Sequence, residues 1–487
     1  MSQRRSWSAS AFSLCLLAVP LVALAAPSQD KIPITTSFEE ARQLYLKGRD
    51  ANEKLRGVEA YVFFEKAAAK DPSFALTFYG MATSTNNNQQ FFEALRKAVA
   101  LSDKVSVGER LMIEALNAGV KGDNDGQRKK LTELVETYPN DERALTLLGV
   151  FYFGNQDYPM AIQYLTQAIA ISPNFSPPYN QLGYAYRFQS KYPEAEKTFQ
   201  KYIELLPGDP NPYDSYAELL MKMGRFDDSI ASYRKALKVD PHFTASMAGI
   251  ANDQMFQSKG DEARKTLRKM YGVARNDGER RTALFWIGRS YVLEGNTQEA
   301  VRTVAEQRAI AQKSGDFAAQ SGDAMLLGNI LLNAEQLDGA AASFAEEITL
   351  MNKASVPAEV KEANRRNSLF DTARVALKRG DMVTAQAQAQ AYQKQVEVRR
   401  IPFEVRQVHE LLGMIALAQH QYDVALAELA QSSAQNPQVL YFTALVLQGK
   451  GDTQGARTAA QAVANFNAMN GNYAFVRSEA QRMATGS

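Results

Sequence analysis

A proline recurs every 34 residues in the middle of this chain, at Pro173, Pro207 and Pro241. The stretch before each proline carries apolar residues at helical spacing in two successive blocks. The first blocks contain, in order, Leu148-Gly149-Tyr152, Leu182-Gly183-Tyr186 and Tyr216-Ala217-Leu220. The second blocks contain Ala161-Leu165-Ala168, Ala195-Phe199-Tyr202 and Ser229-Tyr233-Ala236. This period predicts stacked copies of one helix-turn-helix unit, none of which can bury its apolar face alone.

The first of these units resembles the tetratricopeptide repeat family, whose pattern asks for Leu, Gly and Tyr in one helix and Ala, Phe, Ala and Pro in the next. The matching residues are Leu145, Leu148, Gly149, Tyr152, Ala161, Leu165, Ala168 and Pro173. Small residues such as Gly149, Gly183 and Ala217 are expected where two helices cross, because a larger side chain would force the helices apart. The resemblance implies an all-α fold, a right-handed α-solenoid of helix-turn-helix repeats.

Weaker copies of the template extend in both directions, and we expect about twelve repeats in total. We predict degenerate repeats over residues 39–141, well-matched repeats over 142–243, degenerate repeats over 244–460, and a capping helix and tail over 461–487. A length of 487 residues would otherwise suggest several globular domains. A solenoid, however, grows by adding neighbours and not by enlarging one core.

The start of the chain has the features of a cleaved export signal, residues 1–25. Two arginines precede an apolar run over residues 12–24, and Ala25 ends a small-x-small cleavage site. The run is shorter than the roughly 20 residues that span a bilayer, so a retained membrane anchor is the less favoured interpretation. Residues 26–38 would form a linker. We expect a periplasmic or secreted protein, and the sequence leaves both destinations open.

Charge and cysteine content narrow the classes of partner. Removing Arg4 and Arg5 with the signal takes 55 basic residues to 53, against 53 acidic residues. A neutral chain lacks the clustered basic charge that holds nucleic acid or an anionic membrane. Cys15 is the only cysteine and lies in the signal, so we expect no disulfide and no cysteine metal site in the mature chain.

Catalytic signatures are missing from the sequence. His409-Glu410 comes nearest, but a zinc-protease helix needs a second histidine at position 413, where the chain has Gly413. The chain contains no glycine-rich phosphate loop, no Gly-x-Ser-x-Gly elbow and no dinucleotide fingerprint. We therefore predict a protein that is not an enzyme and that needs no cofactor and no metal.

The resemblance does imply a binding surface, because positions 2, 5, 9 and 12 of each first helix line the concave groove in this family. In this chain, the residues expected in the groove are Arg143, Thr146, Val150, Phe153, Asn180, Tyr184, Arg187, Asp214, Glu218, Met221, Phe285 and Arg289. A groove that mixes aromatic anchors, amides and single charges suits an extended peptide or a partner helix. We predict a protein-interaction scaffold of the cell envelope whose partners are other proteins or peptides.

Two alternatives stay open. A polysaccharide or small-ligand binding protein would use Phe153, Tyr184 and Phe285 as stacking platforms that face one open groove. An enzyme with an unrecognised active site would need a deep pocket with converging titratable groups.

Overall fold

Twenty-five α-helices and two short 3-10 helices make up the ordered elements of the computed structural model, which describes residues 31–85 and 87–486. The inner, odd-numbered helices are α1 (Glu39–Glu53), α3 (Ala75–Ser84), α5 (Val107–Val120), α7 (Glu142–Gly154), α9 (Pro177–Phe188), α11 (Pro210–Lys222), α13 (Thr244–Phe256), α15 (Asp277–Leu293), α17 (Phe317–Asn333), α19 (Ala358–Arg379), α21 (Pro402–Ala418) and α23 (Pro437–Gly449). Their outer partners are α2 (Gly57–Lys70), α4 (Asn88–Leu101), α6 (Asn124–Thr137), α8 (Tyr158–Ile171), α10 (Tyr192–Leu205), α12 (Phe226–Val239), α14 (Gly260–Val273), α16 (Thr297–Lys313), α18 (Leu337–Lys353), α20 (Met382–Arg399), α22 (Tyr422–Leu429) and α24 (Thr453–Ala464). The 3-10 helices are η1 (Ser102–Lys104) and η2 (Gly471–Phe475), and α25 (Arg477–Thr485) ends the chain.

Each odd-numbered helix packs on the even-numbered helix that follows it, so α1 to α24 form twelve pairs. The predicted all-α solenoid of about twelve helix pairs is thereby confirmed. The predicted export signal, residues 1–25, lies outside the described residues. None of the described helices combines the length and the apolarity that crossing a bilayer requires.

The turn inside a pair is short because one residue takes a left-handed backbone conformation. Gln156 has φ 64° in the turn between α7 and α8, and Gly224 has φ 75° in the turn between α11 and α12. The residue after Gln156 is Asp157, whose side chain accepts a hydrogen bond from the Met160 amide and so caps α8. Such turns reverse the chain, which lets the two helices of a pair pack along their length.

The glycines predicted at helix crossings lie where the partner helix leaves no room. A Cβ atom added to Gly183 would lie 2.6 Å from the ring of Phe199, and one added to Gly149 would lie 2.8 Å from Leu165. Gly413, beside His409-Glu410, has the same role, because its added Cβ would lie 2.7 Å from Leu429. The glycine at position 413 is therefore explained by packing.

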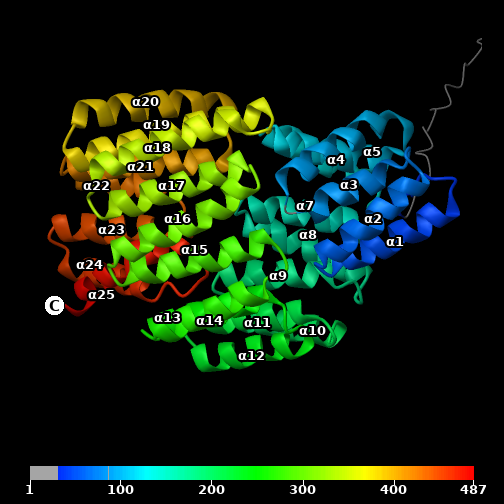
Figure 1. The fold of residues 1–487 in the computed structure, drawn as a ribbon, viewed down its shortest axis with the longest axis horizontal. Coiled ribbons are helices and arrows are strands. Elements are labelled where there is room, and N and C mark those ends of the chain that lie inside the picture. The colour runs from blue at the N-terminus through cyan, green and yellow to red at the C-terminus, as the bar shows by residue number, and fades with distance from the viewer. Residues whose placement is uncertain (1–30, 86, 487) are drawn as a thin grey trace, which may run out of the picture.

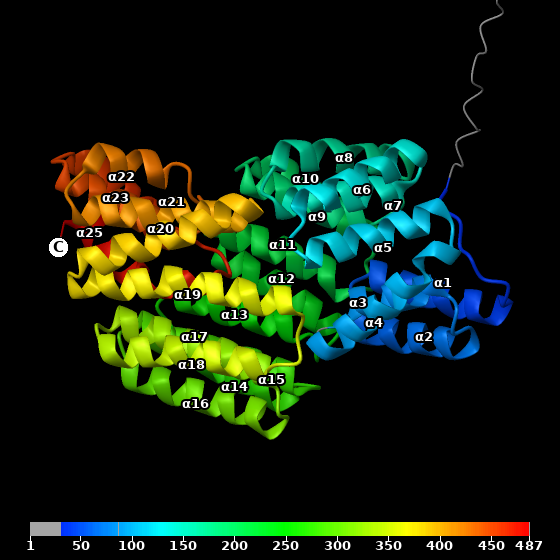
Figure 2. The same cartoon turned by 90° about the horizontal axis from the view of Figure 1, so that it is seen from above.

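The stack of pairs curves until its later members touch the earlier ones (Figures 1 and 2). Arg406 Nη1 donates to the Asn155 carbonyl at 3.4 Å, and Gln156 Nε2 lies 3.4 Å from Ser433 Oγ. Arg399 Nη1 similarly reaches the Lys121 carbonyl at 3.3 Å. The turns at the ends of α5 and α7 therefore rest on the region from α20 to α23.

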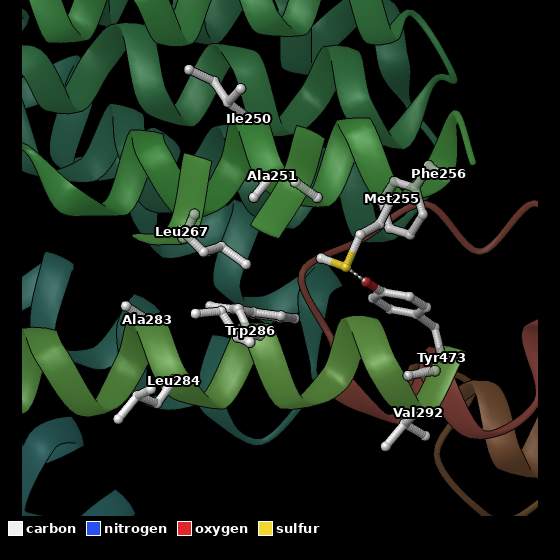
Figure 3. Close-up of a cluster of buried hydrophobic side chains, with 14 of the residues drawn as sticks. Ile250, Ala251, Met255, Phe256, Leu267, Ala283, Leu284, Trp286, Val292 and Tyr473 are labelled. Atoms are coloured by element: carbon white, nitrogen blue, oxygen red, sulfur yellow. Dashed lines mark hydrogen bonds between the residues drawn. The ribbon is translucent and has the colours of Figure 1, made fainter. Parts of the chain in front are cut away.

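The C-terminal segment, residues 465–486, leaves the stack and turns back onto α13 and α15. Tyr473 is fully buried, with its ring 4.8 Å from that of Phe256 and its hydroxyl donating to Asn252 Oδ1 at 3.2 Å. Figure 3 shows Tyr473 among the side chains of α13 and α15, with its hydroxyl against the sulfur of Met255. The predicted capping region thus also covers part of the inner face of the solenoid.

Candidate functional site

A cavity of about 510 Å³ lies on the inner side of the first helix pairs. All but one of the helical residues that line it belong to first helices of pairs, namely α1, α3, α5, α7 and α9, and the exception is Phe64 of α2. The helical lining residues are Tyr45, Arg49, Asn52, Glu53, Phe64, Leu76, Tyr79, Gly80, Thr83, Met112, Glu142, Arg143, Thr146, Leu147 and Pro177. We call this feature the N-terminal groove.

The floor of the N-terminal groove is apolar and aromatic. Phe64 reaches it from the outer helix α2 because Gly48 and Gly80 have no side chains, and added Cβ atoms would lie 2.8 and 2.6 Å from its ring. The ring of Tyr45 packs 5.6 Å from that of Phe64. Burial raises the pKa of Tyr45 and raises that of Tyr79 to about 12, so both phenols stay neutral at physiological pH. A neutral apolar floor favours an apolar side chain of a ligand.

The rim of the groove is charged, but its charges pair with one another. Arg143 Nε lies 2.6 Å from Glu53 Oε1, and Arg143 Nη1 lies 2.6 Å from Glu142 Oε1. Burial by itself would raise the pKa of Glu142, but a hydrogen bond from Lys31 and the charge of Arg143 outweigh burial and lower it. Arg49 also approaches Glu53, at 3.8 Å. The rim therefore offers hydrogen-bonding groups with little net charge.

An extended segment preceding α1 forms one wall of the groove. The Ile32 amide donates to Asp141 Oδ2 at 2.9 Å, and the Thr35 amide donates to Glu109 Oε1 at 2.8 Å. Residues 31–34 line the cavity. We expected a linker over residues 26–38, whereas the described part of that range is held against α5 and α7 by hydrogen bonds. The buried carboxylates of Asp141 and Glu109 hold this segment in place, because they accept hydrogen bonds from its backbone amides.

The structure places two of the predicted groove residues, Arg143 and Thr146, in the N-terminal groove. Val150 is 38% exposed on α7 and does not line the cavity. Phe153 lies in an aromatic cluster, with ring centroids 5.7 Å from both Tyr158 and Phe188. The inner face of α7 therefore carries both kinds of environment, a cavity at its start and packed rings at its end.

Asn180 and Asp214 are buried between helices and are not open to a groove, contrary to the expectation. Asn180 Oδ1 accepts a hydrogen bond from Ser215 Oγ at 2.9 Å, and Asp214 Oδ1 accepts one from Ser246 Oγ at 2.6 Å. Burial and the nearby Glu218 carboxylate raise the pKa of Asp214 to about 8. These polar side chains join successive inner helices, α9 to α11 and α11 to α13.

Tyr184, Arg187 and Glu218 form a local cluster on α9 and α11. Arg187 Nη1 lies 3.1 Å from Glu218 Oε2, and its guanidinium carbon lies 4.7 Å from the centre of the Tyr184 ring. Arg187 is buried, with 7% of its surface exposed. Its charge is therefore already satisfied inside the protein.

Met221, Phe285 and Arg289 also differ from the expectation of an open groove, because they are packed. Met221 is fully buried in the central core. The Arg289 guanidinium carbon lies 5.0 Å from the Phe285 ring centre and 4.4 Å from that of Phe475 in the C-terminal segment. At this level of the solenoid the chain's own C-terminal segment lies where a partner was expected.

The three aromatic residues considered as stacking platforms do not form one surface. Phe153 packs on Tyr158 and Phe188, Tyr184 packs edge-on against Phe199 at 5.2 Å, and Phe285 packs edge-on against Trp286 at 5.1 Å. Among the described residues, no ring contact joins one of the three to another.

The histidine considered as a metal ligand has a carboxylate partner instead. His409 Nδ1 lies 2.7 Å from Glu428 Oε2, across the crossing of α21 and α22. Within residues 31–85 and 87–486, no three His, Cys, Asp or Glu side chains are grouped so that they could hold a metal ion.

Family models place the repeats in agreement with this geometry. Three models described as tetratricopeptide repeat match, one over residues 164–197, one over 142–175 and 211–243, and one over 411–471. This chain is a tetratricopeptide repeat protein. The resemblance drawn from residues 142–243 is thereby confirmed, and its repeats place it among protein-interaction scaffolds.

Among solved structures, two chains titled as crystal structures of MamA are similar at 23% identity with TM-scores of 0.29, and each covers 34% of this chain and 89% or 92% of its own length. A MamA fragment from Desulfovibrio magneticus RS-1 matches at 15% identity with a TM-score of 0.30, covering 34% of this chain and 93% of its own. No curated protein matches this sequence.

The tetratricopeptide pattern contained a signal for the groove residues that the sequence analysis missed. With Gly48 at repeat position 8, positions 5, 9 and 12 of the first repeat are Tyr45, Arg49 and Asn52, and all three line the cavity. With Ala115 at position 8, position 5 of the third repeat is Met112, which also lines it. The predicted groove contains no residue from the repeats before residue 142, because their match to the consensus is weak.

Proposed function

We propose that this tetratricopeptide repeat protein is a non-enzymatic scaffold that binds a segment of a partner protein in the N-terminal groove. One observation carries the proposal: an apolar cavity of about 510 Å³ on the inner helices, bordered by paired charges. Its volume lies within the roughly 300–1,000 Å³ typical of ligand sites. The cavity is large enough for one or two apolar side chains of an extended segment.

The chemistry of the walls defines the segment further. Leu76, Tyr79 and Met112 offer apolar surface, so the affinity would come from burying apolar side chains of the partner. Asn52 and Thr83 lie together at the edge, with 3.4 Å between Asn52 Nδ2 and Thr83 Oγ1, and supply polar groups for the partner's backbone. Since Arg143 already pairs with Glu53, a segment without net charge suits the rim better than an acidic tail.

Site-specific photocrosslinking tests this proposal in the native envelope. A photoreactive residue replaces Met112 inside the groove, and in a matched control it replaces Val62, which is 43% exposed on the outer helix α2. The expected result is reproducible capture of the same protein from position 112 and not from position 62. Failure to capture any protein from position 112 under several growth conditions would overturn the proposal.

A second variant separates binding from folding. Met112→Arg places a charge in the apolar cavity from a side chain that is only partly buried, so we expect partner capture to fall while the helical circular dichroism stays unchanged. Capture at the wild-type level by the folded variant would show that the partner binds elsewhere.

We also propose that the scaffold acts outside the cytoplasm, in the periplasm, in a complex at the cell envelope. The arginines at positions 4 and 5, the apolar run over residues 12–24 and the small residue Ala25 support an exported chain that begins at Ala26. N-terminal sequencing of the protein from the envelope fraction should give Ala26, and a chain starting at Met1 in the cytoplasmic fraction would contradict export.

A further inference from the structure

A second cavity, of about 710 Å³, lies where the C-terminal segment meets the edge of the helix stack. One wall comes from the turn between α11 and α12 and the end of α13, with Lys222, Phe226 and Phe256. The other wall comes from the end of α24, the following loop and α25, with Asn467, Arg477 and Gln481. We call this feature the C-terminal cleft. It is separate from the N-terminal groove, with which it shares no lining residue.

The described lining of the C-terminal cleft includes two cations and no acidic residue. Lys222 Nζ lies 4.4 Å from the centre of the Phe466 ring, and the Arg477 guanidinium carbon lies 4.5 Å from that of Phe256. Among the described residues, neither Lys222 nor Arg477 has a carboxylate within ion-pair distance. Within the described residues, the Arg477 guanidinium donates only to the neutral Asn467 Oδ1, with both Nη atoms at 3.2 Å.

Both cationic side chains are buried or partly buried. Arg477 exposes 5% of its surface and Lys222 is partly buried. Burial and the nearby charge of Arg187 lower the pKa of Lys222 to about 8, and burial lowers that of Arg477 to about 10. Glu218, one helical turn before Lys222 on α11, is already paired with Arg187 at 3.1 Å. Buried charges in proteins are ordinarily paired, so two cations without a counter-ion mark a place where an anion would be stabilised.

We propose that the C-terminal cleft binds a small organic oxyanion, a molecule that bears a carboxylate or a phosphate group. Lys222 and Arg477 hold the charged oxygens, since charge-assisted hydrogen bonds from Lys and Arg are the usual means of binding such groups. Asn467 and Gln481 supply neutral hydrogen-bonding groups, and Phe226 and Phe256 supply an apolar surface for the body of the molecule. The volume, about 710 Å³, exceeds what an inorganic ion needs and falls in the range of small-molecule sites.

Occupation of the cleft has a structural consequence. Lys222 belongs to α11, whereas Arg477 begins α25, so the two lie 255 positions apart in the sequence. An anion shared by the two would join the C-terminal segment to the edge of the stack. Since the site exists only when the segment is docked, the ligand would stabilise the docked arrangement by mass action.

Isothermal titration calorimetry of the full-length mature chain with citrate and with inorganic phosphate, each at constant ionic strength set with sodium chloride, tests this site. We expect saturable binding of at least one anion, and a rise in melting temperature with the same anion. Binding of citrate alone would assign a carboxylate-bearing ligand, and binding of phosphate alone a phosphate-bearing one; either result supports an oxyanion site.

Three variants locate the binding. Lys222→Gln should weaken the affinity about tenfold or more, because a charged hydrogen-bond donor is lost. Gln481→Glu, at an exposed position of α25, should weaken it by placing a negative charge in the cleft. Arg225→Gln removes an exposed neighbouring cation that does not line the cleft and already pairs with Asp228, so it should leave the affinity unchanged. Absence of saturable binding of both anions, or equal affinity in Lys222→Gln and wild type, would overturn the proposal.

Discussion

The same repeat builds two inner faces, that of α1 to α7 and that of α13 and α15, yet one is open to a cavity and the other is covered. The first borders an apolar cavity of about 510 Å³. The second is covered by the C-terminal segment, whose Tyr473 is fully buried against Phe256. The repeat pattern alone does not distinguish these two faces. What distinguishes them is a segment that follows the repeats and folds back over them.

The two regions also differ in the surroundings of their carboxyl groups. Around the N-terminal groove, Glu142 and Glu53 pair with Arg143 at 2.6 Å. On α13, the Asp253 carboxylate is fully buried, and burial together with the charge of Asp227 raises its pKa to about 8. Glu142 is thus held ionised by its cationic partners, whereas Asp253, which is buried against Ser229 and Asp227 of α12, is held protonated at neutral pH.

The largest expected effect comes from uncovering the C-terminal face. Tyr473→Ala removes a fully buried ring and should lower the free energy of unfolding by about 3–5 kcal/mol, as measured by urea denaturation. Tyr473→Phe is the control, because it removes only the hydroxyl that donates to Asn252 and should cost about 1 kcal/mol. If the two variants were equally stable, the ring would not be packed as the structure has it.

The second effect is a difference in stability between alanine substitutions of two glycines that occupy the same repeat position. Gly183→Ala should destabilise the protein by about 1–3 kcal/mol, since the new Cβ would lie 2.6 Å from the buried Phe199 ring. Gly288→Ala should be neutral or stabilising by up to about 1 kcal/mol, because its Cβ would lie 3.8 Å from Thr303 and alanine favours the helix. Thermal unfolding of the two variants measures the difference, and an equal loss in both would contradict the assigned contacts.

The third effect is an opposite pH dependence in the two regions. The raised pKa of Asp253 means that its contribution to stability is present below about pH 4 and is lost as pH rises toward about 8. Asp253→Asn should therefore gain stability relative to wild type as pH rises through that window. The lowered pKa of Glu142 means that its contribution is present above about pH 4 and is lost in acid.

Glu142→Gln should accordingly lose stability relative to wild type as pH rises through about 4 and approach wild type in acid. Urea denaturation of both variants across a pH series measures the two slopes. Slopes of the same sign would show that the surroundings of the Glu142 and Asp253 carboxylates do not differ as the structure has them.

The smallest expected effect concerns the wall of the N-terminal groove. Lys31→Ala removes an ion pair with Glu142 in which the lysine side chain is 52% exposed. Exposed pairs of this kind contribute about 0–1 kcal/mol, so unfolding should change by less than about 1 kcal/mol. A larger loss of stability would mean that residues 31–34 hold the groove together to a greater extent than their backbone hydrogen bonds indicate.

Much of the fold followed from local pattern. The residues of a repeat that must be small or large, such as Gly149 and Leu165, meet within one helix pair, so their sequence spacing is enough to predict the contact. The number of helix pairs could be predicted for the same reason, because the spacing of small and large residues within a pair is recognisable even where the match to the consensus is weak. The candidate site was harder to predict, because positions on the inner face are alike in sequence whether they line a cavity, as Thr146 does, or are packed, as Met221 is.

Sequence by itself determined that this chain forms stacked helix pairs, because each pair is stabilised by contacts between residues about one repeat apart. The tertiary structure alone decided which inner face is open. That outcome depends on contacts such as Tyr473 with Asn252, 221 residues away, and Arg56 with Asp209, 153 residues away. Such contacts form only where the small rotations between successive repeats add up over the whole stack and bring distant segments together.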